Sequence, residues 1–182
     1  MEHERAYDFL LRKCRMEEFK RLETHIKNVG PLKLTVSNKD FITHLSKIII
    51  GQQLSVVSAA AIWKRTKKIL NENNYKRPNK ILDKKLKDAG LSRQKIDYIN
   101  GIIYNKNLSR LSKNSLKKMS SDDYYDLLIK IKGIGPWSIE MSRIFFVGDP
   151  DVFSFLDLGL KNAHLELFDL KFYNKNFYMK FS

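Results

Sequence analysis

Apolar residues recur at helical spacing along nearly the whole chain, and this spacing constrains the fold more than any other feature of the sequence. Phe41, Leu45, Ile48 and Ile49 form the first apolar face of this kind. No segment shows the alternation of apolar and polar residues that is typical of a half-buried strand. The sequence therefore predicts an all-α fold. Similar apolar faces later in the chain carry Ile62, Trp63 and Leu70, then Ile96, Ile99 and Ile103, then Tyr124, Leu127 and Leu128, and finally Trp137, Met141 and Ile144.

One connection between helices has an unusual composition, with Ile134 placed between Gly133 and Gly135. Two glycines around one apolar residue allow a sharp turn and leave backbone N–H groups pointing outward. Such groups bind an anion without reading base sequence. Lys132 adds positive charge beside the turn. From these residues alone, an ordinary connection between two helices is the alternative interpretation.

The charge balance favours a polyanionic partner. The 182 residues include 34 lysines and arginines against 20 aspartates and glutamates, which gives a formal net charge of +14. Each contact between such a surface and a phosphate releases counterions, so nucleic acid is the expected partner. A basic surface without any partner is the alternative.

Several classes of site are excluded by the residues present. Cys14 is the only cysteine, so a disulfide framework, a zinc–cysteine site and an iron–sulfur cluster within the chain are excluded. The four histidines lack the spacing of metal ligands, and we expect no metal site. No apolar run is long enough to span a bilayer and no signal peptide is visible. We expect a monomer in the cytoplasm or nucleoid, or in the nucleus of a eukaryote, without a membrane partner.

Residues 128–141 resemble the helix–hairpin–helix motif of the DNA glycosylase superfamily that also carries a Gly/Pro-rich loop and a catalytic aspartate. Within this superfamily the match is to the 3-methyladenine DNA glycosylase II branch. Residues 49–55, 90–95 and 151–161 are similar to three further segments of that family, in the same order. The resemblance implies one glycosylase domain over residues 1–182, a compact bundle with its active site in a cleft between two lobes. One lobe would comprise about 36–136, and the other about 1–35 with 137–182.

The resemblance assigns the catalytic role to Asp157, which precedes a predicted helix. Cleavage of an N-glycosidic bond builds positive charge on the sugar, which a fixed carboxylate stabilises. A plain N-cap is the alternative role for Asp157. Bifunctional relatives use a lysine at the position of Trp137, and an indole forms no Schiff base, so strand cleavage is not expected. Trp137 and Met141 are expected to line the base pocket, with packing in the core as the alternative.

The resemblance also implies the contacts with DNA. Gln53 matches best the residue that enters the base stack, with Leu54 as its substitute and Gln52 beside them. A monovalent cation bridging hairpin carbonyls and phosphate is a family expectation, and no other cofactor is expected. The expected phosphate contacts are Gly133, Ile134, Gly135, Lys132, Ser92, Arg93, Lys95 and Lys161.

These observations together predict a monofunctional DNA glycosylase that removes alkylated purines such as 3-methyladenine and 7-methylguanine from double-stranded DNA, in base excision repair. The alternatives are a non-catalytic or decayed DNA-binding protein with the same hairpin, and a glycosylase for mismatched uracil or thymine. One departure concerns the C-terminus. Many relatives carry a Trp-x-Pro-x-Arg helix there, whereas this chain has an aromatic tail from Phe172. Either this tail replaces that helix, or the C-terminal lobe is shortened.

Overall fold

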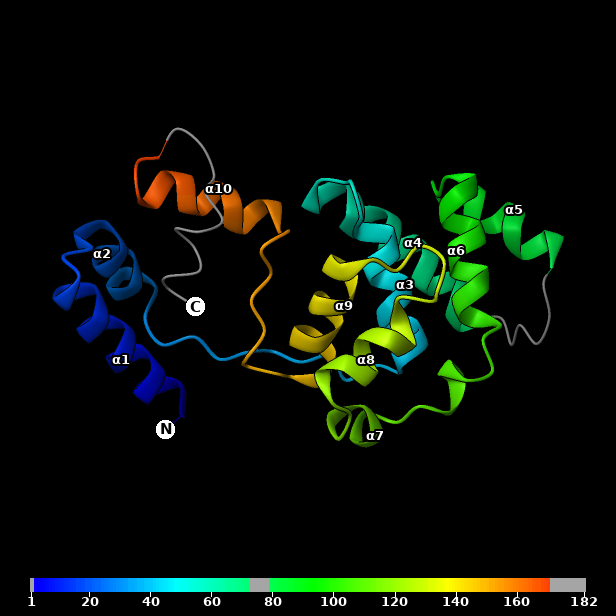
Figure 1. Cartoon of the computed structure of the whole chain (residues 1–182). Helices are drawn as coiled ribbons and strands as arrows, with labels where there is room; N and C mark the ends of the chain where they lie inside the picture. The colour runs from blue at the N-terminus through cyan, green and yellow to red at the C-terminus, as the bar shows by residue number, and fades with distance from the viewer. Residues whose placement is uncertain (1, 73–78, 171–182) are drawn as a thin grey trace. The chain divides into compact units, whose positions relative to one another are not determined.

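The computed structural model describes residues 2–72 and 79–170, and over these residues the chain is helical without a strand (Figure 1). The predicted all-α fold is therefore confirmed. No helix in the described ranges has the length and apolar character needed to cross a membrane. The aromatic tail from Phe172 lies outside the described residues. The elements are α1 (Glu2–Met16), α2 (Lys20–Val29), α3 (Phe41–Gly51), α4 (Val56–Glu72), α5 (Lys80–Asp88), α6 (Arg93–Ile103), η1 (Leu108–Arg110), α7 (Lys113–Lys117), α8 (Ser121–Leu128), α9 (Pro136–Ser142), η2 (Arg143–Val147) and α10 (Leu158–Leu167).

The chain divides into two compact units. Residues 36–152 form one unit, and residues 1–35 with 153–182 form the other. Residues 137–152, which the sequence assigned to the second lobe, lie in the first of these units. The reason is packing: α9 contacts α3, and Ser142 on α9 is hydrogen-bonded to the Tyr124 hydroxyl of α8 at 2.8 Å.

Helix α3 is the centre of the 36–152 unit, in contact with α4, α6, α9 and η1 (Figure 1). The Asp40 side chain starts this helix by accepting a hydrogen bond from the Thr43 N–H at 2.8 Å. Leu45, Ile49 and Ile50 on α3 are completely buried. Because α3 is surrounded, its C-terminal end is fixed relative to α6 and α9, which carry the next parts of the candidate site. The core around it includes Leu82, Leu86, Ile96, Ile99, Ile102, Leu116, Tyr124, Leu128 and Ile139.

The other unit is built on contacts between α1 and α2. The Glu23 carboxylate receives hydrogen bonds or ion pairs from Arg15 at 2.7 Å and from Lys27 at 2.8 Å. The Phe19 ring packs edge-on against the Phe168 ring with centroids 5.1 Å apart. This aromatic contact joins the start of α2 to the end of α10, the helix that carries the candidate catalytic carboxylate.

Candidate functional site

The hairpin between α8 and α9 is anchored by apolar side chains. Ile131 and Ile134 are buried, and the Ile134 N–H donates to the Ile131 carbonyl at 3.0 Å. Gly133 has a φ of +90°, and a β-carbon on it would lie 2.3 Å from a ring carbon of Tyr98. Glycine is therefore required at position 133 by both the backbone and its neighbour.

Gly135 is glycine for a different reason. Its φ is −116° and its ψ is 179°, a conformation that any residue adopts. Apart from its neighbours in the chain, no atom of the described residues lies within 4 Å of the place a β-carbon would take. The protein leaves this surface open, as the close approach of a ligand backbone requires. Lys132, beside it, is exposed and adds positive charge.

The hairpin carbonyls bear on the monovalent cation that the resemblance implies. The Gly133 carbonyl accepts a hydrogen bond from Gln52, and the Ile131 carbonyl accepts one from Ile134. A carbonyl oxygen has two lone pairs, so each retains a further acceptor site. Neutral carbonyl oxygens are the donors that monovalent cations take in proteins. The residues present therefore fit such an ion.

The loop between α3 and α4 presents the residues predicted to enter the base stack. α3 ends at Gly51, and Gln53 follows with a φ of +56°, an uncommon conformation for a residue other than glycine. The Gln53 side chain is exposed, and Leu54 beside it is 38% exposed. Gln53 thus stands at the tip of a tight turn. We name residues 52–55 the insertion loop.

Gln52 is oriented differently from its neighbour. Its side-chain amide donates to the Gly133 carbonyl at 2.9 Å and to the Ser138 hydroxyl at 2.9 Å. Ser138 is buried in α9. One amide group therefore joins the insertion loop to both sides of the hairpin turn, which are more than eighty residues away in the sequence.

The start of α6 holds three residues predicted to contact phosphate, in three different environments. The Ser92 hydroxyl caps α6 by accepting from the Lys95 N–H at 3.3 Å. The Arg93 side chain is 76% exposed and lies 3.2 Å from the Asp97 carboxylate. The Lys95 ammonium donates to the carbonyls of Ile50 at 2.8 Å and Gln52 at 2.7 Å. Burial lowers the pKa of Lys95, whose ammonium has exchanged water for these carbonyls.

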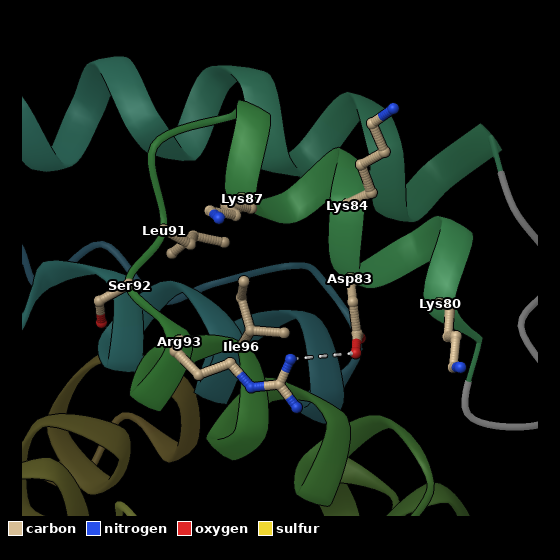
Figure 2. A pocket seen from close by; sticks show the side chains of 8 residues that line it. All are labelled: Lys80, Asp83, Lys84, Lys87, Leu91, Ser92, Arg93 and Ile96. Carbon is tan, nitrogen blue, oxygen red and sulfur yellow. Dashed lines mark ion pairs between the residues drawn. The ribbon is translucent and has the colours of Figure 1, made fainter.

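A hollow of about 690 Å³ lies between α5 and α6, with Leu91 and Ile96 among its lining residues (Figure 2). Figure 2 shows the Arg93 guanidinium directed toward Asp83, 3.9 Å away. Among the described residues that line the hollow, four cationic side chains outnumber one carboxylate. The hollow extends the positive surface at the start of α6. Its cationic residues are Lys80, Lys84, Lys87 and Arg93.

Trp137 and Met141 lie one turn apart on α9, and both are half-buried. The buried residues of α9 are Ser138, Ile139 and Ser142. Over the described residues, the hydrophobic core includes Ile139 but neither Trp137 nor Met141. Over the described residues, this indole and this thioether therefore lie outside the hydrophobic core cluster.

Asp157 is the N-cap of α10. Its carboxylate oxygen Oδ1 accepts from the Leu160 N–H at 2.9 Å, and the side chain is half-buried. A β-carbon at Gly159 would lie 3.1 Å from this oxygen, so glycine leaves room for the carboxylate. Lys161 follows one turn later. Asp157 and Lys161 belong to the unit of residues 1–35 and 153–182, whereas the hairpin, the insertion loop and α6 belong to the 36–152 unit.

Two residues of this arrangement were not singled out from the sequence. Tyr98 supports the hairpin, and Ser138 accepts the hydrogen bond from Gln52. Tyr98 stands three positions after Lys95, a spacing that places both on one face of α6. This spacing could have indicated from the sequence that Tyr98 lies on the same side of α6 as Lys95.

Comparisons with known proteins agree with this architecture. The chain is 31% identical over 153 residues to DNA-3-methyladenine glycosylase 1 of Schizosaccharomyces pombe, covering 81% of this chain and 66% of that protein. It is 29% identical over 135 residues to DNA-3-methyladenine glycosylase of Saccharomyces cerevisiae, covering 67% of this chain and 45% of that protein. The chain thus spans just under two thirds of the first relative and less than half of the second. No family model matches it.

A solved structure gives the same result at the level of the fold. It is that of S. pombe 3-methyladenine DNA glycosylase (Mag1) in complex with abasic DNA. The TM-score is 0.74 and the identity 27%, covering 87% of this chain and 80% of that one. With its hairpin, its N-capping aspartate and these relatives, the chain belongs to the 3-methyladenine DNA glycosylase family of the helix–hairpin–helix superfamily.

Proposed function

We propose that this protein is a monofunctional DNA glycosylase, which excises alkylated purines by flipping the base and hydrolysing the N-glycosidic bond, in base excision repair. It acts as a monomer on double-stranded DNA. The observation that carries the proposal is the Asp157 carboxylate, fixed at the N-terminus of α10 by the Leu160 N–H at 2.9 Å.

The hairpin supports the DNA-binding part of this function. Among the described residues, only the chain neighbours of Gly135 lie within 4 Å of the place its β-carbon would take, and Lys132 is exposed nearby. A phosphate bound at such a turn positions the duplex without reading its sequence. The related Mag1 structure contains abasic DNA, the product that remains after base excision.

Asp157 supports the hydrolytic part. The departing base leaves positive charge on the deoxyribose, and a carboxylate stabilises that charge in the transition state. A carboxylate has about four acceptor sites, so the same group can cap a helix and face a substrate. Gly159 supports this assignment, because a larger residue would crowd Oδ1 at 3.1 Å.

Trp137 supports both the absence of strand cleavage and the choice of substrate. An indole provides no amine for a Schiff base, so the product is an intact strand with an abasic site. Alkylated purines such as 3-methyladenine and 7-methylguanine carry positive charge. An electron-rich ring attracts such a cation by about 0.5–2 kcal/mol. Flipped bases are also held by stacking on aromatic side chains.

The test is base release from methylated duplex DNA, with strand breaks measured before and after hot alkali. Wild type is expected to release 3-methyladenine or 7-methylguanine and to give breaks after alkali only. Asp157→Asn should abolish release while binding DNA, because asparagine caps a helix as well as aspartate does. Asp151→Asn, at an exposed position, is the matched control and should retain activity.

Three results would contradict parts of the proposal. Turnover in Asp157→Asn near the wild-type rate would remove Asp157 from the mechanism. Breaks before alkali would show lyase activity. Binding without release from methylated DNA would favour a DNA-binding protein or another lesion, and substrates with mismatched uracil or thymine would separate these two.

A further inference from the structure

Lys95 holds the insertion loop through main-chain carbonyls. The last carbonyls of any helix lack intrahelical partners and must be satisfied elsewhere. In α3 the Ile48 and Ile49 carbonyls accept from the Gln52 N–H, at 3.2 and 3.3 Å. The Gly51 carbonyl accepts from the Leu54 N–H at 3.4 Å. Among the described residues, one side chain donates to both of the next carbonyls, those of Ile50 and Gln52.

That donor is the ammonium of Lys95, 2.8 Å from the Ile50 oxygen and 2.7 Å from the Gln52 oxygen. Two of its three N–H groups are used in this way. A cation at this place also opposes the partial negative charge of the helix C-terminus. Lys95 therefore stabilises the exact turn that leads to Gln53, which holds a φ of +56°.

We propose that Lys95 is a positioning residue for base flipping. It holds the insertion loop at a fixed position relative to the hairpin. Gln53 can then enter the base stack while the hairpin binds the phosphate backbone of the same duplex. The inference rests on the proposed function, because it assigns the loop and the hairpin to one DNA duplex. It gives Lys95 a different role from the phosphate contact expected from the sequence.

The link between loop and hairpin passes through Gln52. Lys95 holds the Gln52 carbonyl, and the Gln52 side chain donates to Gly133 and Ser138, both at 2.9 Å. The side chains of Lys95 and Gln52 thus join the end of α3 to the backbone of the hairpin and to the Ser138 hydroxyl of α9. A displacement of the loop relative to the hairpin breaks at least one of these hydrogen bonds.

Helix α6 also contacts the hairpin directly. Tyr98, one turn after Lys95, places its ring against Gly133, and its hydroxyl accepts from the Gln94 amide at 2.6 Å. The same helix therefore carries one residue to the loop and another to the hairpin. Because both contacts come from α6, the distance between the insertion loop and the hairpin is set by the regular geometry of one helix.

The alternative role for Lys95 predicts a different measurement. A lysine that binds phosphate releases a counterion, so its loss reduces the salt dependence of DNA binding by about one unit in the log–log slope. A positioning lysine leaves this slope unchanged and alters the rate at saturating DNA instead. A mispositioned group costs about 10- to 100-fold in rate.

The experiment compares Lys95→Met with wild type on duplex DNA that contains an alkylated purine. We expect an unchanged salt slope and a fall of about 10-fold or more in the single-turnover rate at saturating DNA. Lys85→Met, which removes one exposed cation from α5, is the matched control and should change neither quantity. A slope reduced by about one, with the saturated rate unchanged, would overturn the proposal.

The double variant Lys95→Met/Gln52→Ala tests whether the two side chains act together. Members of one network give non-additive effects, so the double variant should lose little more than the more affected single variant. Losses that multiply fully would mean independent roles and would contradict the proposal. If Lys95→Met fails to give a cooperative melt, Lys95→Gln, which keeps one donor, takes its place with the same expected slope.

Unstacking of the DNA by the insertion loop can also be measured without base excision. Duplex DNA with a tetrahydrofuran abasic-site analogue and 2-aminopurine beside it reports unstacking by fluorescence. Lys95→Met should bind this DNA with reduced fluorescence enhancement, and an enhancement equal to wild type would contradict the proposal. If wild type releases no alkylated purine, the proposed substrate is wrong, but this readout and the salt slope still test Lys95.

Discussion

The ring of Tyr98 lies against the backbone of Gly133, so close that a β-carbon at position 133 would be 2.3 Å from the ring. Gly133 also has a φ of +90°, where an L-residue is strained. Gly135, two residues later, has neither constraint. The two glycines of the hairpin therefore have separable roles, one in the fold and one at the surface.

Gly133→Ala should lower the free energy of unfolding by about 1–3 kcal/mol, since it combines strain with overpacking. Gly135→Ala should stay within about 0.5 kcal/mol of wild type but bind duplex DNA less tightly. Thermal melts and fluorescence anisotropy check the two expectations. Equal melting temperatures for both variants, or full DNA affinity in Gly135→Ala, would refute the division of roles.

Buried His44 should make stability depend on pH. Burial, with Lys47 and Lys113 nearby, lowers the pKa of this imidazole from 6.5 to about 4. Between these values the unfolded chain binds a proton that the folded chain does not, so stability falls as the pH drops from 6.5 toward 4. The loss reaches about 3 kcal/mol from this residue.

Denaturant unfolding at a series of pH values measures this effect. In His44→Leu the dependence between pH 6.5 and 4 should be flatter, with an added cost for the changed shape. His25→Leu, at an exposed position, is the control and should keep the wild-type dependence. A His44→Leu curve parallel to that of wild type would exclude His44 as the cause.

Two neighbouring tyrosines on α8, one buried and one exposed, allow the stability contribution of a buried hydroxyl to be measured. The Ser142 hydroxyl donates to the Ile139 carbonyl at 2.8 Å, so the Tyr124 hydroxyl must donate to Ser142. Burial raises the pKa of Tyr124 to about 12. Tyr124→Phe should cost about 0.5–1.5 kcal/mol of stability. Tyr125→Phe, with a side chain 40% exposed, should cost less than about 0.5 kcal/mol in the same unfolding measurement.

Gly159→Ala should lower the excision rate by crowding the candidate catalytic carboxylate of Asp157. The new β-carbon would lie 3.1 Å from Asp157 Oδ1 and displace it, so the excision rate should fall several-fold. Gly101→Ala on α6, with open space around it, should retain the rate and gain about 0.5–1 kcal/mol of stability. An undiminished rate in Gly159→Ala would show that the position of Asp157 tolerates this crowding.

Local features of the fold could be read from the sequence. Helical spacing identified α3, α6 and α8, and the N-cap role considered for Asp157 is present, because a cap depends on residues three positions apart. The placement of residues 137–152 could not be read, since it depends on packing between α9 and α3. The contacts of Gln52 and Lys95 join segments far apart in the chain, and periodicity holds no information about them.

The backbone hydrogen bonds of the insertion loop have a consequence for its evolution. Lys95 binds main-chain carbonyls, which every amino acid possesses, so its support of the loop does not depend on the side chains at positions 53 and 54. The φ of +56° at position 53 disfavours β-branched residues there. Substitutions at these two positions, other than β-branched residues at position 53, therefore change the shape and polarity of the exposed tip of the loop without removing the Lys95 hydrogen bonds. The same scaffold can thus present different side chains at the tip of the insertion loop while keeping the hydrogen bonds that join loop and hairpin.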